Sequence, residues 1–160
     1  MHIREVTAAD ATAILEIILP IIRQGTTYAL DRDMNPEDAL SYWTGHDRET
    51  FVAEEDGEIL GTYFLRPNQA GGGRHVGNCG YMTRTSATGR GVARAMCEHS
   101  LKLAASRGYR AMQFNFVIST NERAVRLWQS LGFEIVGRVP GAFEHPAQGY
   151  VDALVMYRTL

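Results

Sequence analysis

A glycine-containing turn between a strand pattern and a helix pattern offers the clearest chemistry in this chain. Residues 78–94 read Asn-Cys-Gly-Tyr-Met-Thr-Arg-Thr-Ser-Ala-Thr-Gly-Arg-Gly-Val-Ala-Arg, and the helical pattern begins at Val92. The first N–H groups of a helix lack carbonyl partners, and the helix dipole adds partial positive charge there. Because Gly89 and Gly91 have no Cβ atom, an anion can approach the backbone closely. The turn predicts a phosphate or pyrophosphate site, and its plain alternative is a helix cap that binds nothing.

Two nucleotide-binding motifs are excluded by the residues around this turn. No Gly-Lys-Ser/Thr follows it, as a Walker loop requires. No acidic residue follows a second strand, as a dinucleotide site needs for its ribose. Arg90 and Arg94 add cationic side chains beside the turn.

The elements that position this turn follow from hydrophobic spacing. Strands are predicted at residues 2–6, 50–55, 58–66, 75–83, 111–118, 133–139 and 150–158, and helices at residues 8–22, 36–45, 92–106 and 122–131. The pair Asp56-Gly57 predicts a tight hairpin, Pro20 predicts a kink or an end in the first helix, and residues 140–146 are predicted to connect the last two strands. Because residues 75–118 form a strand, a helix and a strand, they require a right-handed crossover between parallel strands. The predicted class is α/β, a mixed sheet with helices on its faces.

Composition narrows the class of protein. The chain has 160 residues, of which 45% are hydrophobic and 21% charged, as expected for a single domain over residues 1–160. A formal net charge of −2 predicts no nucleic-acid partner. With neither a signal peptide nor a long apolar run, we expect a cytoplasmic protein without a membrane partner. Cys79 and Cys97 are too few for a disulfide framework, and the five histidines lack metal-ligand spacing, so no metal is expected.

Two motifs together resemble a known family. Residues 121–133, Asn-Glu-Arg-Ala-Val-Arg-Leu-Trp-Gln-Ser-Leu-Gly-Phe, resemble the Asn-x-x-Ala…Leu-Gly-Phe segment of the GNAT superfamily of N-acetyltransferases. Residues 80–93 are similar to that family's coenzyme A signature, Arg/Gln-x-x-Gly-x-Gly/Ala, and the order of elements matches over essentially the whole chain. The resemblance implies a mostly antiparallel central sheet with a splayed parallel strand pair and helices on both faces. It also implies an acetyl-CoA-dependent N-acetyltransferase.

The resemblance assigns cofactor-binding roles to individual residues. Main-chain groups of Tyr81, Met82 and Thr83 would pair with the pantetheine arm of acetyl-CoA, and Asn121 would hydrogen-bond the arm near its amide. The pyrophosphate would be held by the amides of Gly89, Arg90, Gly91, Val92, Ala93 and Arg94. The side chains of Arg84 and Arg90 would either meet the 3′-phosphate of the coenzyme or lie in solvent.

Two positions depart from the family pattern. Thr88 stands where the family usually has Arg or Gln, so its main-chain contact is kept but its side chain offers no cationic or amide group. Trp128 occupies a cofactor-binding position at which many members have a Tyr. That Tyr protonates the departing thiolate, and an indole cannot do this. A water, the coenzyme thiol or a hydroxyl such as that of Tyr28 would replace it. We favour the remaining alternative, that no acid is needed, because a thiol leaves readily near its own pKa.

The expected mechanism is direct attack of the substrate amine on the thioester carbonyl. Positioning would supply most of the rate enhancement. The main-chain N–H of Met82 is predicted to stabilise the oxyanion. The candidate bases are Glu5, Glu54 and His75, with water as an equal alternative.

Two strand asparagines and one loop tyrosine are the candidates for acceptor binding. Asn78 shares a strand face with Met82, and Asn115 lies in the next strand; buried amides there are either satisfied within the core or hold a substrate. Tyr28 either walls the acceptor pocket or packs under the long segment at residues 24–34. The segments 113–128 and 136–141 are similar to the proline-analogue acetyltransferase branch of the family. That likeness implies a small amino acid or cyclic amino-acid analogue as acceptor.

Several alternatives stay open at this point. A non-catalytic module that senses acetyl-CoA would use the same turn, and a protein or peptide N-acetyltransferase would need a more open groove than residues 24–34 leave. Cys79 would be an acyl-accepting nucleophile only with an activating base, and buried cysteines are usually inert. Glu144 and His145 are predicted in a loop, either gating the substrate or solvated. Edge pairing of the C-terminal strands, frequent in similar proteins, predicts a homodimer.

Overall fold

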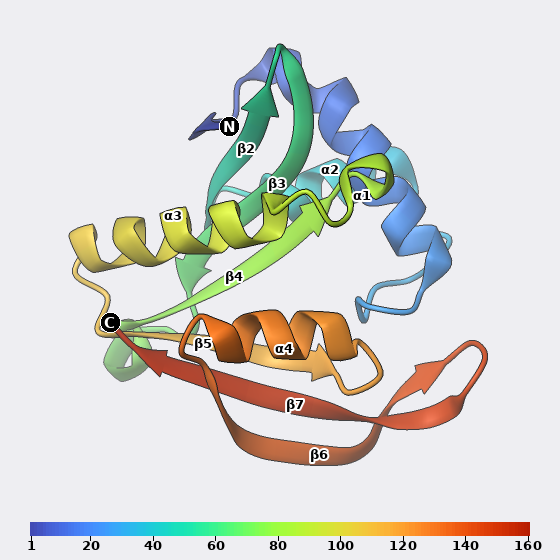
Figure 1. Cartoon of the computed structure of the whole chain (residues 1–160), viewed down its shortest axis with the longest axis vertical. Helices are drawn as coiled ribbons and strands as arrows, with labels where there is room; N and C mark the ends of the chain where they lie inside the picture. The colour runs from blue at the N-terminus through green and yellow to red at the C-terminus, as the bar shows by residue number, and fades with distance from the viewer.

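One twisted sheet forms the frame of the molecule (Figure 1). The computed structural model describes residues 1–160 and contains a seven-stranded sheet in the order β1-β2-β3-β4-β5-β7-β6. Neighbouring strands are antiparallel except β4 and β5, which are parallel, so the predicted mixed sheet with one parallel pair is confirmed. The strands are β1 (His2–Glu5), β2 (Glu49–Glu55), β3 (Glu58–Pro67), β4 (Val76–Thr83), β5 (Ala111–Ile118), β6 (Glu134–His145) and β7 (Gly149–Thr159).

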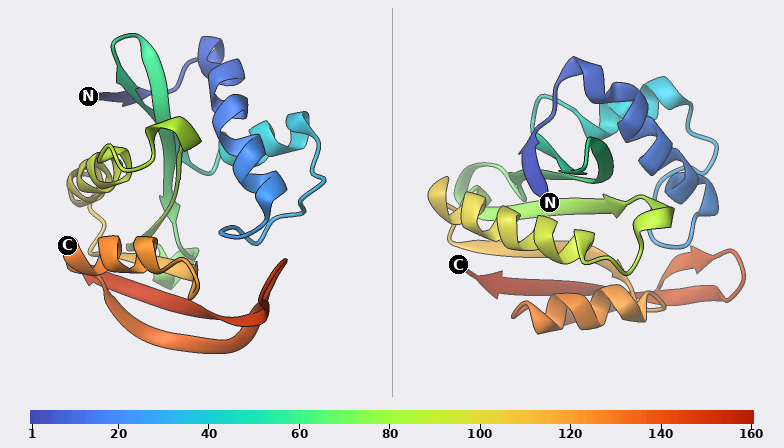
Figure 2. Two further views of the ribbon diagram at one scale, coloured as in Figure 1. Left: turned by 45° about the vertical axis from the view of Figure 1, so that its right-hand side comes forward. Right: turned by 45° about the horizontal axis from the view of Figure 1, so that its top comes forward.

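Helices cover both faces of this sheet, as Figure 2 shows. α1 (Ala11–Gln24) and α2 (Pro36–Trp43) lie on one face. α3 (Val92–Ser106) and α4 (Glu122–Ser130) lie on the other, and α3 is the crossover between the parallel strands β4 and β5. None of the helices has the length and apolar character that crossing a bilayer requires.

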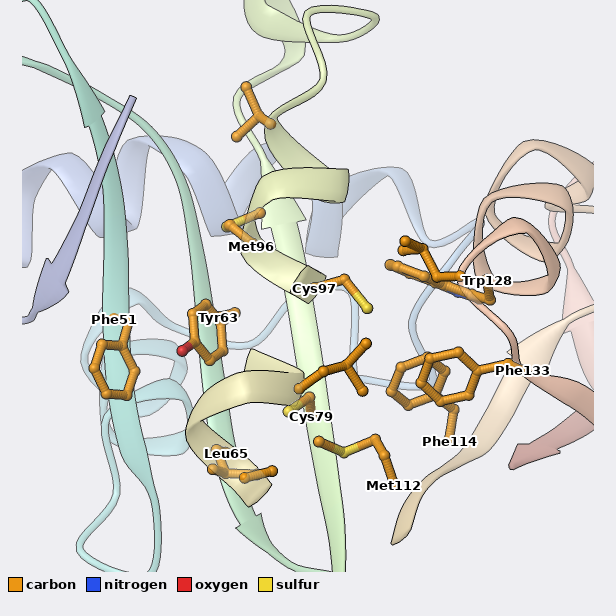
Figure 3. Packing of buried hydrophobic residues seen from close by; sticks show 14 of the residues in the cluster. Phe51, Tyr63, Leu65, Cys79, Met96, Cys97, Met112, Phe114, Trp128 and Phe133 are labelled. Atoms are coloured by element: carbon orange, nitrogen blue, oxygen red, sulfur yellow. The ribbon is translucent and has the colours of Figure 1, made fainter. Parts of the chain in front are cut away.

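Each face of the sheet has its own apolar core. Under α3 and α4, 19 buried residues pack together, and Tyr63, Met96 and Trp128 are among them (Figure 3). Under α1 and α2, a second cluster of 10 buried residues contains Ile18 and Trp43. β4 contributes side chains to both cores, because successive residues of a strand point to opposite faces of the sheet.

The hairpin between β2 and β3 forms at the predicted pair. Asp56 has φ 52° and Gly57 has φ 80°, the two left-handed residues of a type I′ turn. α2 likewise begins where predicted, since the side chain of Asn35 accepts a hydrogen bond from the Asp38 N–H at 2.8 Å.

Of the kink or end predicted at Pro20, the end does not occur, because α1 continues through the proline to Gln24. Proline within a helix costs about 3 kcal/mol, because it removes one N–H and its ring crowds the preceding turn. Ile22, beyond the proline, is 1% exposed, and burying such a side chain contributes about 1.5–3 kcal/mol. Packing on the sheet therefore offsets the local penalty.

The connection predicted at residues 140–146 is also wrong, because these residues belong to β6 except for Pro146. The prediction relied on the tendency of proline and glycine to end strands. β6 tolerates them because it lies at the edge of the sheet, where Pro140 needs no ladder N–H. The register shifts between Val139 and Phe143, and Gly141 there has φ 57°, so the strand bends and continues.

Candidate active site

The parallel strands β4 and β5 separate to form a fork. They pair only at Val76–Ala111 and Gly77–Met112, and then diverge. A cavity of about 650 Å³ opens at this fork. Its lining includes many of the predicted site residues: Tyr28, Asn78, Tyr81, Met82, Thr83, Thr88, Ala93, Asn115, Asn121 and Trp128.

The register of β4 decides which of its main-chain groups face the fork. The N–H of Arg84 donates to the carbonyl of Leu60 in β3 at 2.7 Å. Such pairs recur at every second residue of an antiparallel ladder, so Met82 also directs its N–H and C=O toward β3. This corrects the predicted use of the Met82 amide, because the fork-facing groups of β4 belong to Tyr81 and Thr83.

The hydroxyl of Tyr28 holds both main-chain groups of Tyr81. It accepts a hydrogen bond from the Tyr81 N–H at 2.8 Å and donates one to the Tyr81 C=O at 2.8 Å. Burial raises the pKa of the Tyr28 phenol well above its ordinary value, so the hydroxyl keeps its proton. A peptide-like amide lying along this edge would make the same two bonds.

The turn before α3 has the geometry of an anion site. Gly89 has φ 87° and Gly91 has φ 81°, a conformation that L side chains rarely adopt. No side chain caps the helix, whose first internal bond runs from the Ala95 N–H to the Gly91 carbonyl at 3.0 Å. The preceding helical N–H groups therefore have no carbonyl within the helix, and they belong to Val92, Ala93 and Arg94.

Arg84 and Arg90, expected either to meet the 3′-phosphate or to lie in solvent, each form an ion pair. Arg84 lies 3.2 Å from the carboxylate of Glu16, and Arg90 lies 2.6 Å from that of Glu55. Neither side chain lines the cavity. These partners lie far away in the sequence, so residue spacing alone did not predict them.

A different arginine reaches the turn. Arg123, in the first turn of α4, lines the cavity. A Cβ atom placed on Gly89 would lie 3.3 Å from an Arg123 guanidinium nitrogen. Sequence reasoning missed Arg123, although its position two residues after Asn121 placed it at the same helix start.

Asn121 and Trp128 both line the cavity at the fork. The Asn121 side chain caps α4 by accepting a hydrogen bond from the Ala124 N–H at 3.4 Å. Its amide nitrogen donates to no group within the chain and so can meet a ligand. The Trp128 ring packs against Tyr81 and Phe114, with centroid distances of 5.1 and 5.2 Å.

The two candidate acceptor asparagines differ in their surroundings. Asn78 is 7% exposed and joins the fork strands, because its Nδ2 donates to the Gln113 carbonyl at 3.0 Å. Asn115 is exposed rather than buried, and its amide donates to Asn68 at 2.7 Å and accepts from Gln113 at 3.0 Å. The premise of two buried core amides holds for Asn78 only.

The candidate bases do not reach the fork. Glu5, Glu54 and His75 line no part of the cavity, and Glu54 pairs with Arg4 at 3.0 Å. Glu144 and His145, at the end of β6 rather than in a loop, line a smaller cavity of about 460 Å³ that shares Tyr28 with the larger one.

His145 and Cys79 are two further candidate groups whose surroundings disfavour a reactive role. The Nδ1 atom of His145 accepts hydrogen bonds from the N–H groups of Ala147 and Gln148, so this nitrogen already has partners within the chain. Cys79 is buried, and burial raises the pKa of its thiol to about 12, which keeps it protonated. Neither is suited to accept a proton or an acyl group.

Comparison with known proteins gives consistent matches. The sequence profile of the Acetyltransferase (GNAT) family matches residues 15–133. N-acetyltransferase aca1 of Schizosaccharomyces pombe is 26% identical over 151 residues, which cover 84% of this chain and 72% of that protein. A GCN5-related N-acetyltransferase from Kribbella flavida is 44% identical with a TM-score of 0.94, covering 99% of this chain and 97% of that one. A phosphinothricin acetyltransferase from Sinorhizobium meliloti, in complex with acetyl-CoA, is 20% identical with a TM-score of 0.87 over 99% of this chain and 88% of that one, a likeness of fold.

Proposed function

Because the chain belongs to the Acetyltransferase (GNAT) family, we propose that it acetylates the amine of a small molecule, an amino acid or a cyclic amino-acid analogue. The implied acyltransferase fold is confirmed, and the enzyme is an acetyl-CoA-dependent N-acetyltransferase. Family membership does not specify the acceptor, so the class of acceptor is our proposal.

The cover over the cavity is the observation that supports a small acceptor. The segment between α1 and α2 lines the cavity through residues 27–30, and Tyr28 ties it to β4. Its ends are tied together as well, since Arg23 donates to the Arg32 carbonyl at 2.6 Å and Arg32 donates to the Arg23 carbonyl at 2.8 Å. A small amine fits beneath this segment, whereas an extended peptide would have to displace it.

For the co-substrate, we assign the pyrophosphate to the turn and the pantetheine arm to the fork edge. The open amides of Gly89, Gly91, Val92, Ala93 and Arg94 and the side chain of Arg123 supply donors and positive charge, whereas the predicted Arg90 amide already donates to the Ala87 carbonyl at 3.2 Å. Along β4, the fork-facing groups of Thr83 and the C=O of Tyr81 would pair with the arm, with Asn121 opposite. The Tyr28 hydroxyl must then leave Tyr81, whose C=O the arm takes over and whose N–H is left for the thioester carbonyl.

Direct attack suits these surroundings. As the amine nitrogen bonds to the acetyl carbon, the carbon–sulfur bond breaks and sulfur leaves with the electron pair. The Tyr81 N–H, which faces the fork, replaces that of Met82 as the proposed oxyanion donor. Since no carboxylate or imidazole lines this cavity, water takes the proton from nitrogen.

The acceptor branch rests on the residues at the closed end of the fork. Asn115 and Trp128 line the cavity and fall within the segment 113–128 that resembles the proline-analogue acetyltransferases, and Asn78 lines the same cavity from β4. We therefore expect azetidine-2-carboxylate to be an acceptor.

Thiol release from acetyl-CoA, measured with a panel of amines, tests the proposal. The panel contains azetidine-2-carboxylate, proline, primary amino acids and a peptide with a free N-terminal alanine. We expect turnover of a small amino or imino acid, with its loss in Asn78→Ala and Asn115→Ala while acetyl-CoA binding persists. Turnover of the peptide alone would refute the small-acceptor proposal, and binding without thiol release would indicate a sensor.

A further inference from the structure

The side chains that line the fork cavity carry charge of one sign only. Arg66 and Arg123 are its charged residues, and no Asp or Glu lines it. Arg123 lies beside Gly89, at the turn. Arg66 lies toward the other end, because it pairs with Asn78 where β4 and β5 begin to separate. Five strand residues, or roughly 16 Å, separate Asn78 from the end of β4.

The guanidinium of Arg66 is oriented by the fork itself. Its Nε lies 3.4 Å from the side-chain oxygen of Asn78, and the Asn78 amide nitrogen donates to the Gln113 carbonyl at 3.0 Å. Both ends of the Asn78 amide are therefore engaged within the protein. Asn78 positions Arg66, and the terminal nitrogens of Arg66 are the donors that remain for a ligand.

The positive charge at this end is only partly balanced. Within 4 Å of Arg66 the one carboxylate is that of Asp47, at 3.6 Å. Asp47 is already the partner of Arg48, with contacts of 2.8 and 3.2 Å, and this pairing lowers the pKa of the Asp47 carboxyl. Two guanidinium groups share one carboxylate, which leaves a net charge of about +1 beside the cavity.

Burial strengthens the effect of this unbalanced charge. The side chain of Arg48 is 7% exposed, and its Nη1 has no hydrogen-bond partner. Both guanidinium groups lie over the ring of Phe64, Arg48 at 4.6 Å and Arg66 at 5.7 Å from its centroid. The Arg48 charge is buried and the Arg66 side chain is 32% exposed, and buried or partly buried charges are screened less than surface charges. A cationic acceptor would be repelled here, and an anionic group would be attracted.

We propose that Arg66 binds the carboxylate of the acceptor, so that the enzyme selects amines that carry a carboxylate over neutral or polycationic amines. This inference rests on the proposed function and names the residue that sets its specificity. The amine end of such an acceptor then lies toward Tyr81, where the fork-facing N–H groups are.

Matched acceptors with and without the carboxylate test the role of Arg66. Azetidine-2-carboxylate, its carboxamide and azetidine are assayed with wild-type enzyme, Arg66→Met and Arg66→Lys. A hydrogen-bonded ion pair of this kind corresponds to an effect of about 10- to 100-fold. We expect Arg66→Met to raise KM by this factor for the carboxylate and to leave KM for the carboxamide within about twofold. Arg66→Lys should recover part of the loss, because lysine keeps the positive charge but lacks the planar pair of N–H donors of a guanidinium.

Arg126→Met is the control variant, since the Arg126 side chain is 73% exposed and lies outside the cavity. All variants should keep the wild-type Kd for acetyl-CoA and a cooperative thermal transition. An equal loss on carboxylate and carboxamide in Arg66→Met, or no loss on either, would overturn the inference. Wild-type turnover confined to amines without a carboxylate would also overturn it and would leave only the small-molecule acceptor of the proposed function, whereas no turnover of any small amine would overturn both.

Discussion

The side chain of Tyr28 occupies the edge of β4 that faces the fork. Its hydroxyl takes the place of a peptide group, accepting from one main-chain N–H and donating to the C=O of the same residue, Tyr81. Because the phenol keeps its proton, the contact does not depend on pH across the neutral and mildly alkaline range. The residue lies 53 positions before its partner, so only folding brings the two together.

We predict that Tyr28→Phe destabilises the protein without weakening acetyl-CoA binding. The lost hydrogen bonds tie the loop after α1 to β4, and the free energy of unfolding should fall by about 1–3 kcal/mol. The groups of Tyr81 become free for the pantetheine arm, so the Kd for acetyl-CoA should stay equal or fall. Denaturant unfolding and calorimetric titration measure the two quantities.

Tyr42→Phe is the matched control, because Tyr42 lines the same cavity and packs edge-on against Phe64 at 6.4 Å. It should change neither quantity. A Kd more than tenfold weaker in Tyr28→Phe would mean that the hydroxyl contacts the carrier directly.

At the scale of elements, the turn between β4 and α3 combines a strand edge with a helix start. The strand ends at Thr83, and the helix begins at Val92 after two glycines in the left-handed region. A Cβ atom at Gly91 would meet no atom within 4 Å, so space inside the protein does not demand glycine there. Glycine is required there by the left-handed backbone conformation and by the close approach of a phosphate.

We predict that Gly91→Glu strongly weakens acetyl-CoA binding while lowering stability only modestly. The left-handed conformation costs a side chain about 1–2 kcal/mol. The added carboxylate lies at the positive end of α3, where it occupies and repels the predicted phosphate site. The Kd should rise by at least about tenfold, equivalent to about 1.4 kcal/mol.

Gly71→Glu provides the control, since Gly71 also has a left-handed φ of 54° and open space around the position a Cβ atom would take, but lies in the turn before β4. It should show a comparable loss of stability and an unchanged Kd. Acetyl-CoA affinity that survives Gly91→Glu would remove the turn from the proposed site.

Over the whole molecule, the C-terminal hairpin is the part least covered by other elements. Figure 1 shows β6 as the outermost strand of the sheet, beyond β7. β6 pairs only with β7, which leaves its other edge open. Large apolar side chains are exposed on this hairpin: Ile135, Val136, Val139 and Tyr150.

We propose that this hairpin edge joins two copies of the chain as a homodimer. Open apolar edges invite pairing with another strand, and burying them removes apolar surface from water. Light scattering should give twice the chain mass of 17.8 kDa. Val136→Glu should shift the protein to a monomer, because a buried charge without a partner is costly.

Glu122→Lys, at an exposed position on α4, is the control and should leave the mass unchanged. A wild-type protein that stays monomeric at micromolar concentration would contradict the proposal.

Local patterns were sufficient wherever local interactions dominate. The spacing of apolar residues predicted α3 at residues 92–106 and β5 at residues 111–118, and both have these bounds in the structure. The turn at Asp56-Gly57 and the helix cap at Asn35 were equally predictable, because each depends on a few adjacent residues. The order of elements then implied the parallel crossover, since a strand, a helix and a strand permit little else.

Tertiary packing decided whatever depends on distant partners. The pairing of β4 with β3 turned the amide of Met82 away from the fork, because a ladder assigns alternate residues to opposite edges. Glu55 and Glu16 pair with Arg90 and Arg84, the two arginines expected either at the phosphate or in solvent, and no spacing rule predicts an ion pair between separate elements. Core burial kept α1 helical through Pro20, since the gain comes from the sheet beneath it. Strand identities are therefore local properties of this chain, whereas the side from which each strand offers its donors belongs to the assembled sheet.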